Sequence, residues 1–190
     1  MSIKAGFAVC GSFCSFSKVI PQMQSLVNDN VEVIPIMSQN AAGISTRFGK
    51  AEDIRAQIEN ICGREAITSI EGAEPIGPKK LCDVLIVAPC TGNTLAKMAL
   101  GVTDTSVTMA VKSHMRNNRP VVLAVSTNDA LSNSAINIGK LKNTKNIYFV
   151  PMKQDDPAGK PNSMAADFSL IRQTVDNALE GRQINPVMLG

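Results

Sequence analysis

Two short segments of the chain are apolar at nearly every position, residues 82–88 (CDVLIVA) and residues 120–125 (PVVLAV). A strand with one wet face alternates apolar and polar residues, whereas a strand covered on both faces has a continuous apolar run. Both segments therefore predict central strands of a parallel sheet enclosed by helices. Residues 5–10 are apolar too and end in Gly11-Ser12, which predicts a third buried strand that feeds a turn.

Helical spacing of apolar residues alternates with these strands along the chain. Further strands are expected at residues 31–37, 66–70 and 146–150, the last of these being the final strand. Helices are expected at 16–27, 52–61, from 91 through 99, at about 105–116, at 132–141 and at 164–179. The alternation predicts right-handed crossovers and one α/β domain over residues 1–190, with a doubly wound parallel sheet. Residues 152–163 (MKQDDPAGKPNS) predict a long loop, of the kind that forms a lid or binding segment.

Composition narrows the classes of partner. With 190 residues, of which 44% are hydrophobic and 18% charged, the chain is typical of a globular protein. The net charge is only +3 and no basic run is long, so nucleic acid is not expected as a partner. No apolar run approaches the roughly 20 residues of a membrane span, and the first residues lack a signal-peptide pattern. Five scattered cysteines predict reduced thiols in a cytoplasmic protein. Because neither an apolar span nor a signal pattern is found, no contact with a membrane is expected.

Metal and triad chemistry have little support. The sequence has one histidine, His114, and neither a Cys-x-x-Cys nor a His-x-x-x-His spacing, so no metal site is expected. His114 lies in the polar stretch 112–119, which predicts a solvated side chain at a helix end rather than a catalytic base.

Small polar residues follow three of the expected strands, at 11–15 (GSFCS), 38–40 (SQN) and 89–94 (PCTGNT). Ligands of open parallel sheets bind beyond the carboxyl ends of the strands, where the strand order reverses. Glycine lets the backbone approach an anion, hydroxyls donate to it, and a helix N-terminus attracts it. The three exits together predict one pocket for a phosphorylated, ring-bearing ligand. For Ser12, Ser38 and Thr91 taken singly, the alternative is a helix cap or turn residue.

Standard nucleotide motifs are missing. No Walker lysine and no Gly-x-Gly-x-x-Gly is present, so neither a nucleoside triphosphate nor a standard dinucleotide site is predicted. Cys90 follows a buried strand, and we expect a packed thiol there rather than a nucleophile.

Residues 89–97 (PCTGNTLAK) resemble the Pro-Ala-Ser-Ala-Asn-Thr-type motif of the homo-oligomeric flavoprotein family. The similarity continues through residues 101–104 (GVTD) and the strand at 120–125, so it covers most of the chain. That family includes phosphopantothenoylcysteine decarboxylase, lantibiotic cysteine decarboxylases and flavin prenyltransferase. The resemblance implies a flavodoxin-like three-layer α/β/α fold, FMN as cofactor, and assembly into trimers or dodecamers. By position it implies Gly11, Ser12 and Ser38 on the side of the flavin phosphate, and Cys90, Thr91, Gly92, Asn93 and Thr94 along the flavin.

A narrower resemblance, to one branch of this family in spore-forming bacteria, is carried by residues 11–16 (GSFCSF), 88–94 (APCTGNT), 154–157 (QDDP) and 160–163 (KPNS). It implies that the chain works with a different, NAD(P)-binding chain in the mother cell during sporulation. The reaction implied is the aromatising oxidation of a pyridine dicarboxylate. Two carboxylates call for cations near them. Candidate substrate contacts are therefore Arg47, Lys160, Asn162 and Ser163, with Lys50 nearby; for each cation the alternative is ordinary solvated surface.

Two alternatives come from other reactions or roles in the family. The cysteine decarboxylases use a histidine after the second strand, but residues 38–50 contain none, and their Pro-x-Met-Asn segment is replaced here by residues 125–129 (VSTND). The Arg-Glu pair of flavin prenyltransferase, expected at about 126–127, is missing as well. These departures disfavour decarboxylation and prenyl transfer. A non-catalytic scaffold role with a vestigial flavin pocket is the remaining alternative.

Overall fold

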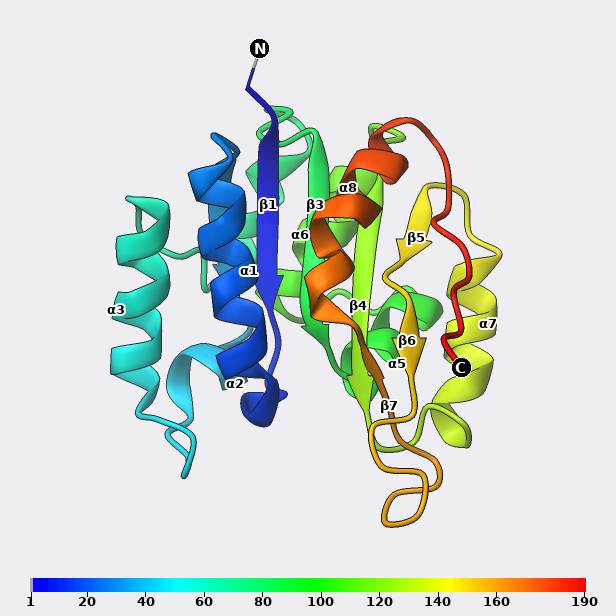
Figure 1. The fold of residues 1–190 in the computed structure, drawn as a ribbon. Coiled ribbons are helices and arrows are strands. Elements are labelled where there is room, and N and C mark those ends of the chain that lie inside the picture. Colours follow the sequence, from blue (N-terminus) through cyan, green and yellow to red (C-terminus); the bar gives the residue numbers. More distant parts are fainter. Residues whose placement is uncertain (1) are drawn as a thin grey trace.

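The computed structural model describes residues 2–190. Parallel strands form the centre of the structure (Figure 1), and the pairing identifies five of them. They are β1 (Lys4–Val9), β2 (Glu32–Met37), β3 (Val84–Cys90), β4 (Val121–Thr127) and β5 (Ile147–Phe149), in the spatial order β2-β1-β3-β4-β5. The chain thus moves outward from β1 to β2, then returns past β1 to β3. The predicted doubly wound sheet is confirmed, and it is one single sheet of the flavodoxin-like type.

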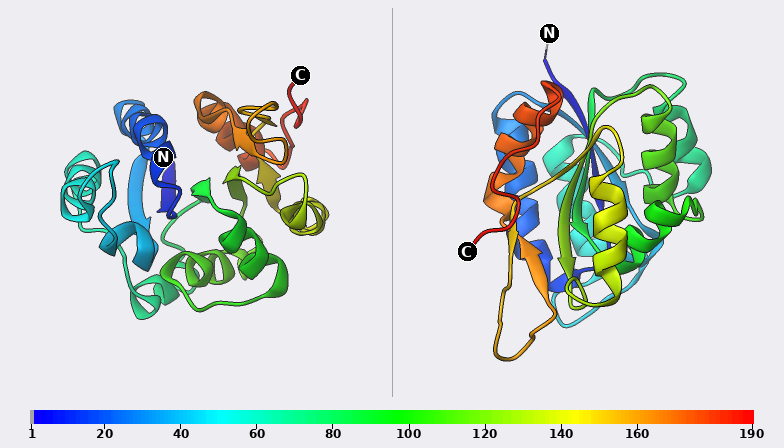
Figure 2. Two further views of the ribbon diagram at one scale, coloured as in Figure 1. Left: turned by 90° about the horizontal axis from the view of Figure 1, so that it is seen from below. Right: turned by 90° about the vertical axis from the view of Figure 1, so that its right-hand side faces the viewer.

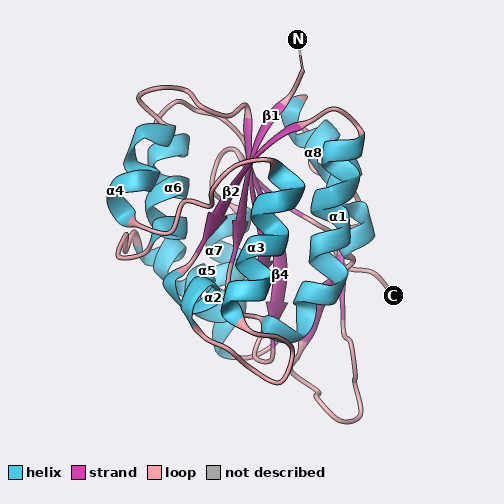
Figure 3. Cartoon of the chain, turned by 90° about the vertical axis from the view of Figure 1, so that its left-hand side faces the viewer, coloured by secondary structure: helices cyan, strands magenta, loops and turns pink. Residues whose placement is uncertain are grey.

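Two hydrophobic cores lie on the two faces of this sheet, because successive residues of each strand point to opposite sides. On one face, Leu85 and Val87 pack under α4 (Ile70–Ala73), α5 (Gly92–Leu100), α6 (Ser106–Met115) and α7 (Asn133–Lys142). On the other, Val84 and Ile86 pack under α1 (Phe16–Asn28), α3 (Ala51–Cys62) and α8 (Ile171–Leu179). Figure 3 shows α6 and α1 on opposite sides of the strands. All seven residues of β3 are buried, as its apolar run predicted.

The helix predicted at residues 164–179 is wrong in its first part. Residues Met164–Ala166 form β7, which pairs antiparallel with Ser126 and Thr127 at the end of β4 and with β6 (Met152–Lys153). The apolar spacing from residue 164 fits a helix, but the free edge of β4 offers unpaired backbone groups that a returning strand satisfies. Helix α8 starts only at Ile171, after the turn η3 (Phe168–Leu170), where the side chain of Asp167 accepts a hydrogen bond from the backbone N–H of Ser169. Within residues 2–190 the sheet therefore has seven strands, and β5 is not the last of them.

The strand predicted at residues 66–70 is wrong as well. Only Ile67 pairs with the sheet, through a single bridge to Ile36. Ser69 accepts a hydrogen bond from the backbone N–H of Gly72 and so caps α4, which begins at Ile70. The cap begins a helix before the strand can extend.

The segment 152–163 begins with β6 and continues as a loop that projects beyond the carboxyl edge of the sheet (Figures 1 and 2). Internal hydrogen bonds hold the loop, from the Gly159 N–H to Asp156 Oδ1 at 2.9 Å and from Gln154 Nε2 to the Pro161 carbonyl at 2.8 Å. The loop was predicted; its use as a lid stays a prediction.

Two kinds of feature are absent from residues 2–190. Within them, none of the helices is long and apolar enough to span a bilayer. The same residues contain no group of three or more His, Cys, Asp or Glu side chains arranged to hold a metal ion.

His114 is buried, in contrast to the solvated side chain that its polar neighbours predicted. Its Nε2 lies 3.1 Å from the Pro120 carbonyl oxygen, which can only accept, so Nε2 carries the proton. Its Nδ1 lies 3.6 Å from Cys82 Sγ and accepts from that thiol. Burial lowers the pKa of His114 from 6.5 to about 4, so the side chain is neutral at physiological pH.

We predict that replacing His114 by glutamine flattens the pH dependence of stability between pH 7 and 4.5. The unfolded chain takes up a proton near pH 6.5 and the folded chain only near pH 4, so acid favours unfolding in this window. Between pH 7 and pH 4.5 the free energy of unfolding of the wild type should fall by about 2–3 kcal/mol more than that of the variant. Urea unfolding at pH 7 and at pH 4.5 measures this free energy, with Lys112→Gln on the same helix as the control. An equal loss in wild type and His114→Gln would contradict the assignment.

Candidate functional site

A cavity of about 750 Å³ opens at the carboxyl edge of the sheet. It lies where β1 and β3 are neighbours, the point at which the strand order reverses. Its walls come from residues 11–15 after β1, 91–93 around the start of α5 and 126–129 at the end of β4. The hairpin formed by β6, β7 and the loop between them adds Asp155, Lys160 and residues 163–165. Lys18, Phe48 and Phe168 complete the wall. Three phenylalanines, Phe13, Phe48 and Phe168, give it aromatic surface.

The structure brings together only part of the residues that the sequence singled out. Those that line the cavity are Gly11, Ser12, Thr91, Gly92, Asn93, Lys160 and Ser163. Those outside its wall are Ser38, Arg47, Lys50, Cys90, Thr94 and Asn162. The exit of β2 does not contribute, contrary to expectation: Ser38 caps the short helix α2 (Gln39–Gly43) by accepting a hydrogen bond from the Ala41 N–H at 3.2 Å. The exit of β4 takes its place.

Three serine hydroxyls meet at one end of the cavity. Ser12 Oγ, Ser15 Oγ and Ser126 Oγ lie 3.0–3.1 Å from one another, two from the turn after β1 and one from the end of β4. No acidic residue lies in the first turn of η1 (Phe13–Ser15) or of α1, and Lys18 also lines the cavity. Hydroxyls that now bond to each other can turn their protons toward an anion. We call Ser12, Ser15 and Ser126 the serine cluster.

Ser15 belongs to the predicted strand exit 11–15 but was not singled out within it, and Ser126 lies outside the three predicted exits. Ser126 follows the apolar run 120–125 just as Ser12 and Thr91 follow their strands, so the same rule of strand exits could have found it.

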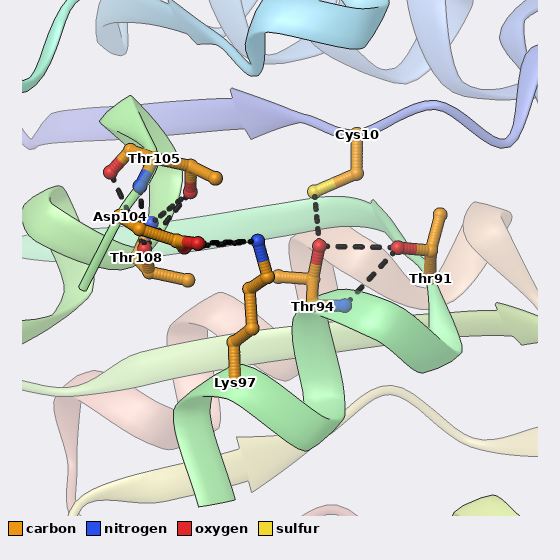
Figure 4. Close-up of polar contacts among 7 residues, drawn as sticks. All are labelled: Cys10, Thr91, Thr94, Lys97, Asp104, Thr105 and Thr108. Carbon is orange, nitrogen blue, oxygen red and sulfur yellow. Dashed lines mark hydrogen bonds and ion pairs between the residues drawn. The ribbon is translucent and has the colours of Figure 1, made fainter. Parts of the chain in front are cut away.

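The exit of β3 faces the cavity with Thr91 and Asn93 and turns Thr94 away from it. Thr91 caps α5, with its Oγ1 accepting from the Thr94 N–H at 3.3 Å. Thr94 Oγ1 lies 3.0 Å from Thr91 Oγ1 and donates to Cys10 Sγ at 3.3 Å, which ties α5 to the residue that follows β1 (Figure 4). Thr94 is therefore a structural link behind the wall.

Residues 101–104, part of the motif similarity, connect α5 to α6. Gly101 ends α5 in the left-handed region with φ of 74°. Asp104 pairs with Lys97 at 2.9 Å, and the side chains of Thr105 and Thr108 form a capping box at the start of α6 (Figure 4). These residues position α5 without touching the cavity.

Neither thiol behind the cavity is poised for chemistry. Cys10 and Cys90 are fully buried, and burial raises the pKa of Cys10 to about 11 and that of Cys90 well above its ordinary value. Both are protonated at neutral pH, in line with the expectation that Cys90 is packed. Cys14, at the cavity wall, is exposed.

A carboxylate, Asp129, stands in the wall beside the start of α5. Its Oδ1 accepts hydrogen bonds from Thr127 Oγ1 at 2.6 Å and from Ser134 Oγ at 2.8 Å. The bond from Thr127, and after it that from Ser134, lowers the pKa of Asp129, so the group is ionised at neutral pH. No motif in the sequence had singled this residue out.

The cationic residues proposed for substrate are less free than expected. Lys160 Nζ lies 3.2 Å from Asp155 Oδ2, so its charge is compensated inside the hairpin. Hydrogen bonds from Ser163 and Lys160 lower the pKa of Asp155. Arg47 does not line the cavity; its guanidinium carbon lies 4.9 Å from the ring centre of Phe48, which does line it.

Comparison with known proteins identifies the family to which this chain belongs. The family model named Flavoprotein matches residues 2–177. The chain belongs to the Flavoprotein family. It is 46% identical to the B subunit of dipicolinate synthase from Bacillus subtilis (strain 168) over 98% of this chain and 93% of that protein. The resemblance inferred from the strand-exit motifs is thereby confirmed.

Solved structures agree with this assignment. The crystal structure of the dipicolinate synthase B subunit from Bacillus halodurans superimposes with a TM-score of 0.91 at 39% identity, covering 100% of this chain and 99% of that one. The FMN-dependent cysteine decarboxylase SpaF gives a TM-score of 0.69 at 23% identity over 94% and 95% of the two chains, which supports the fold alone.

We predict that Gly92→Ala destabilises the protein by about 1–3 kcal/mol. A Cβ on Gly92 would lie 2.6 Å from Thr127 Oγ1, 2.8 Å from Ser134 Oγ and 2.9 Å from Asp129 Oδ1. The carboxylate of Asp129 and the two hydroxyls that donate to it would therefore have to shift. The matched control is Gly139→Ala in α7, where a Cβ has nothing within 4 Å; alanine should stabilise that helix by about 0.5–1 kcal/mol. Urea unfolding measures the change in the free energy of unfolding of both variants. A stabilising effect of Gly92→Ala would be incompatible with this packing.

Proposed function

We propose that the chain is the B subunit of dipicolinate synthase. In this proposal it acts with the NAD(P)-binding A subunit of that enzyme, in the mother-cell cytoplasm of a sporulating bacterium, to convert dihydrodipicolinate or its hydrated precursor into dipicolinate. The observation that carries the proposal is the 46% identity to a protein of that name over 98% of the chain. The cavity at the β1/β3 junction adds a place for a small ligand.

The residues of the cavity fit FMN, which we propose as its ligand. Membership of the Flavoprotein family supports it. The serine cluster offers hydroxyl donors for a phosphate, with Lys18 in the same wall, and the three phenylalanines offer surface for a planar ring. Thr91 and Asn93 add polar groups beside the ring surface. FMN, when bound, supplies an acceptor for a hydride.

From dihydrodipicolinate the proposed reaction removes two electrons and two protons, formally a hydride and a proton. The hydrated precursor first loses one molecule of water. Either of two groups can accept the hydride: the nicotinamide that the A subunit holds in this proposal, or a flavin bound in this chain's cavity. In either case the role of this chain's cavity is to bind the dihydropyridine ring and to orient it.

Charge in the cavity bears on the proposed substrate contacts. Its charged side chains are Lys18 and Lys160 against Asp129 and Asp155, a formal balance of zero. A dicarboxylate is therefore not attracted by net charge, and we propose that the A subunit contributes cations to its binding. Contacts from Arg47, Lys160, Asn162 and Ser163 to the substrate stay predictions.

The alternatives gain no specific support. The chain's one histidine, His114, is buried beside Cys82 and the Pro120 carbonyl and does not line the cavity, so it cannot serve a decarboxylase site there. The cavity is open and holds several polar side chains, which favours a ligand-binding role over that of a vestigial scaffold.

We also propose a homo-oligomer, a trimer or dodecamer by the family resemblance. Two large apolar side chains support it, since Leu100 on α5 and Ile136 on α7 are 72% and 76% exposed. Helices α5 and α7 pack against each other, so both residues belong to one side of the molecule.

The experiment that tests the main proposal measures dipicolinate formation with the purified A subunit alone, this chain alone, and both together. We expect product only from the mixture, because the proposal divides the substrate-binding groups between the two chains. Full activity from the A subunit without this chain would overturn the proposal that this chain takes part in catalysis.

We predict that Ser126→Ala weakens FMN binding up to about tenfold while riboflavin, which lacks the phosphate, is bound with nearly unchanged affinity. The reason is the loss of one hydroxyl donor from the serine cluster. Titration of flavin fluorescence measures both affinities, with Ser25→Ala on the exposed face of α1 as control. Equal weakening for the two ligands would place the phosphate elsewhere.

A further inference from the structure

The last two residues of β4 divide the cavity into two chemically different ends. Neighbouring residues of a strand point to opposite faces, so Ser126 turns toward the α1 side and Thr127 toward the α5 and α7 side. The contacts agree: Ser126 meets Ser12 and Ser15, whereas Thr127 meets Asp129. One end thus consists of neutral hydroxyl donors, and the other of a carboxylate acceptor.

The carboxylate end is held from three elements. Thr127 at the end of β4 and Ser134, the second residue of α7, both donate to Asp129 Oδ1. Gly92, the first residue of α5, packs so closely that a side chain there would collide with the same three groups. The orientation of Asp129 is therefore set before a ligand arrives.

One oxygen of Asp129 remains for a ligand. Within residues 2–190, no other residue donates a hydrogen bond to its Oδ2, although Asp129 is half-buried and lines the cavity. A half-buried carboxylate oxygen is stabilised when it accepts a hydrogen bond from a donor such as an N–H group, and it repels a second anion.

We propose that Asp129 is a specificity-determining residue that accepts a hydrogen bond from a ring N–H of the ligand. The ligand class is then an anion joined to an N–H-bearing ring, with the anion at the serine cluster and the N–H edge at Asp129. The inference rests on the proposed binding of FMN. Oxidised FMN belongs to this class, since it carries a phosphate and a single ring N–H, that of the imide.

Asp129→Asn separates this role from a purely structural one. The amide oxygen of asparagine still accepts from Thr127 and Ser134, so the link between β4 and α7 is kept. The position of Oδ2 becomes an NH₂ donor, which opposes a ligand N–H. The control is Asp53→Asn on α3, which removes the same charge outside the cavity wall.

The test compares dissociation constants of FMN and 3-methyl-FMN, which lacks the ring N–H, for the wild type and both variants, together with the melting temperature of each apoprotein. We expect Asp129→Asn to weaken FMN about ten- to hundredfold. We also expect the wild type to prefer FMN over 3-methyl-FMN by a similar factor and Asp129→Asn to lose that preference, with Asp53→Asn like the wild type.

Three results would overturn the inference in distinguishable ways. Unchanged FMN affinity in Asp129→Asn removes the role of Asp129 and leaves the FMN proposal standing. Equal weakening of FMN and 3-methyl-FMN, with a lowered melting temperature, assigns Asp129 to the fold alone. A wild type that binds no FMN overturns the FMN proposal and this inference with it.

Discussion

Burial of the central strands on both faces is the constraint on which the rest of this structure depends. β1, β3 and β4 have apolar side chains on each side, so their faces cannot hold polar chemistry, and helices must cover both. Polar groups are left to the carboxyl edge. Because the strand order reverses between β1 and β3, the turn after β1 continues into α1 on one face and the exit of β3 continues into α5 on the other. The cavity lies between these two exits.

How much the sequence could predict follows from this constraint. Continuous apolar runs identified the buried strands, and the residues after them, Ser12, Thr91 and Asn93, were found because strand exits of a parallel sheet share one edge. The exit of β4 at residues 126–129 was not predicted, although it carries small polar residues after an apolar run as the other exits do. Ser38 could not be separated from a helix cap, since a serine that caps and a serine that binds have the same local sequence.

Other features depend on contacts between distant segments. β6 and β7 have two and three residues, too short for a periodic signal, and they form because β4 leaves an edge free near Ser126. His114 has polar neighbours in sequence, yet the Pro120 carbonyl and Cys82, which come together only in the fold, remove it from water. Local pattern carries no information on either.

The same antiparallel pairing links the hairpin to both ends of the cavity. Ser126 pairs with Ala165 and Thr127 with Met164, so the two residues that divide the cavity are also the residues that anchor β7. Lys160 and Asp155 lie in the loop that β7 closes, and their mutual ion pair keeps this loop from adding net charge to the wall. A shift of β7 along β4 would therefore disturb the serine cluster and the support of Asp129 together. Because the cavity is balanced in charge, its selectivity has to come from where donors and acceptors stand, and β4 with its hairpin fixes those places.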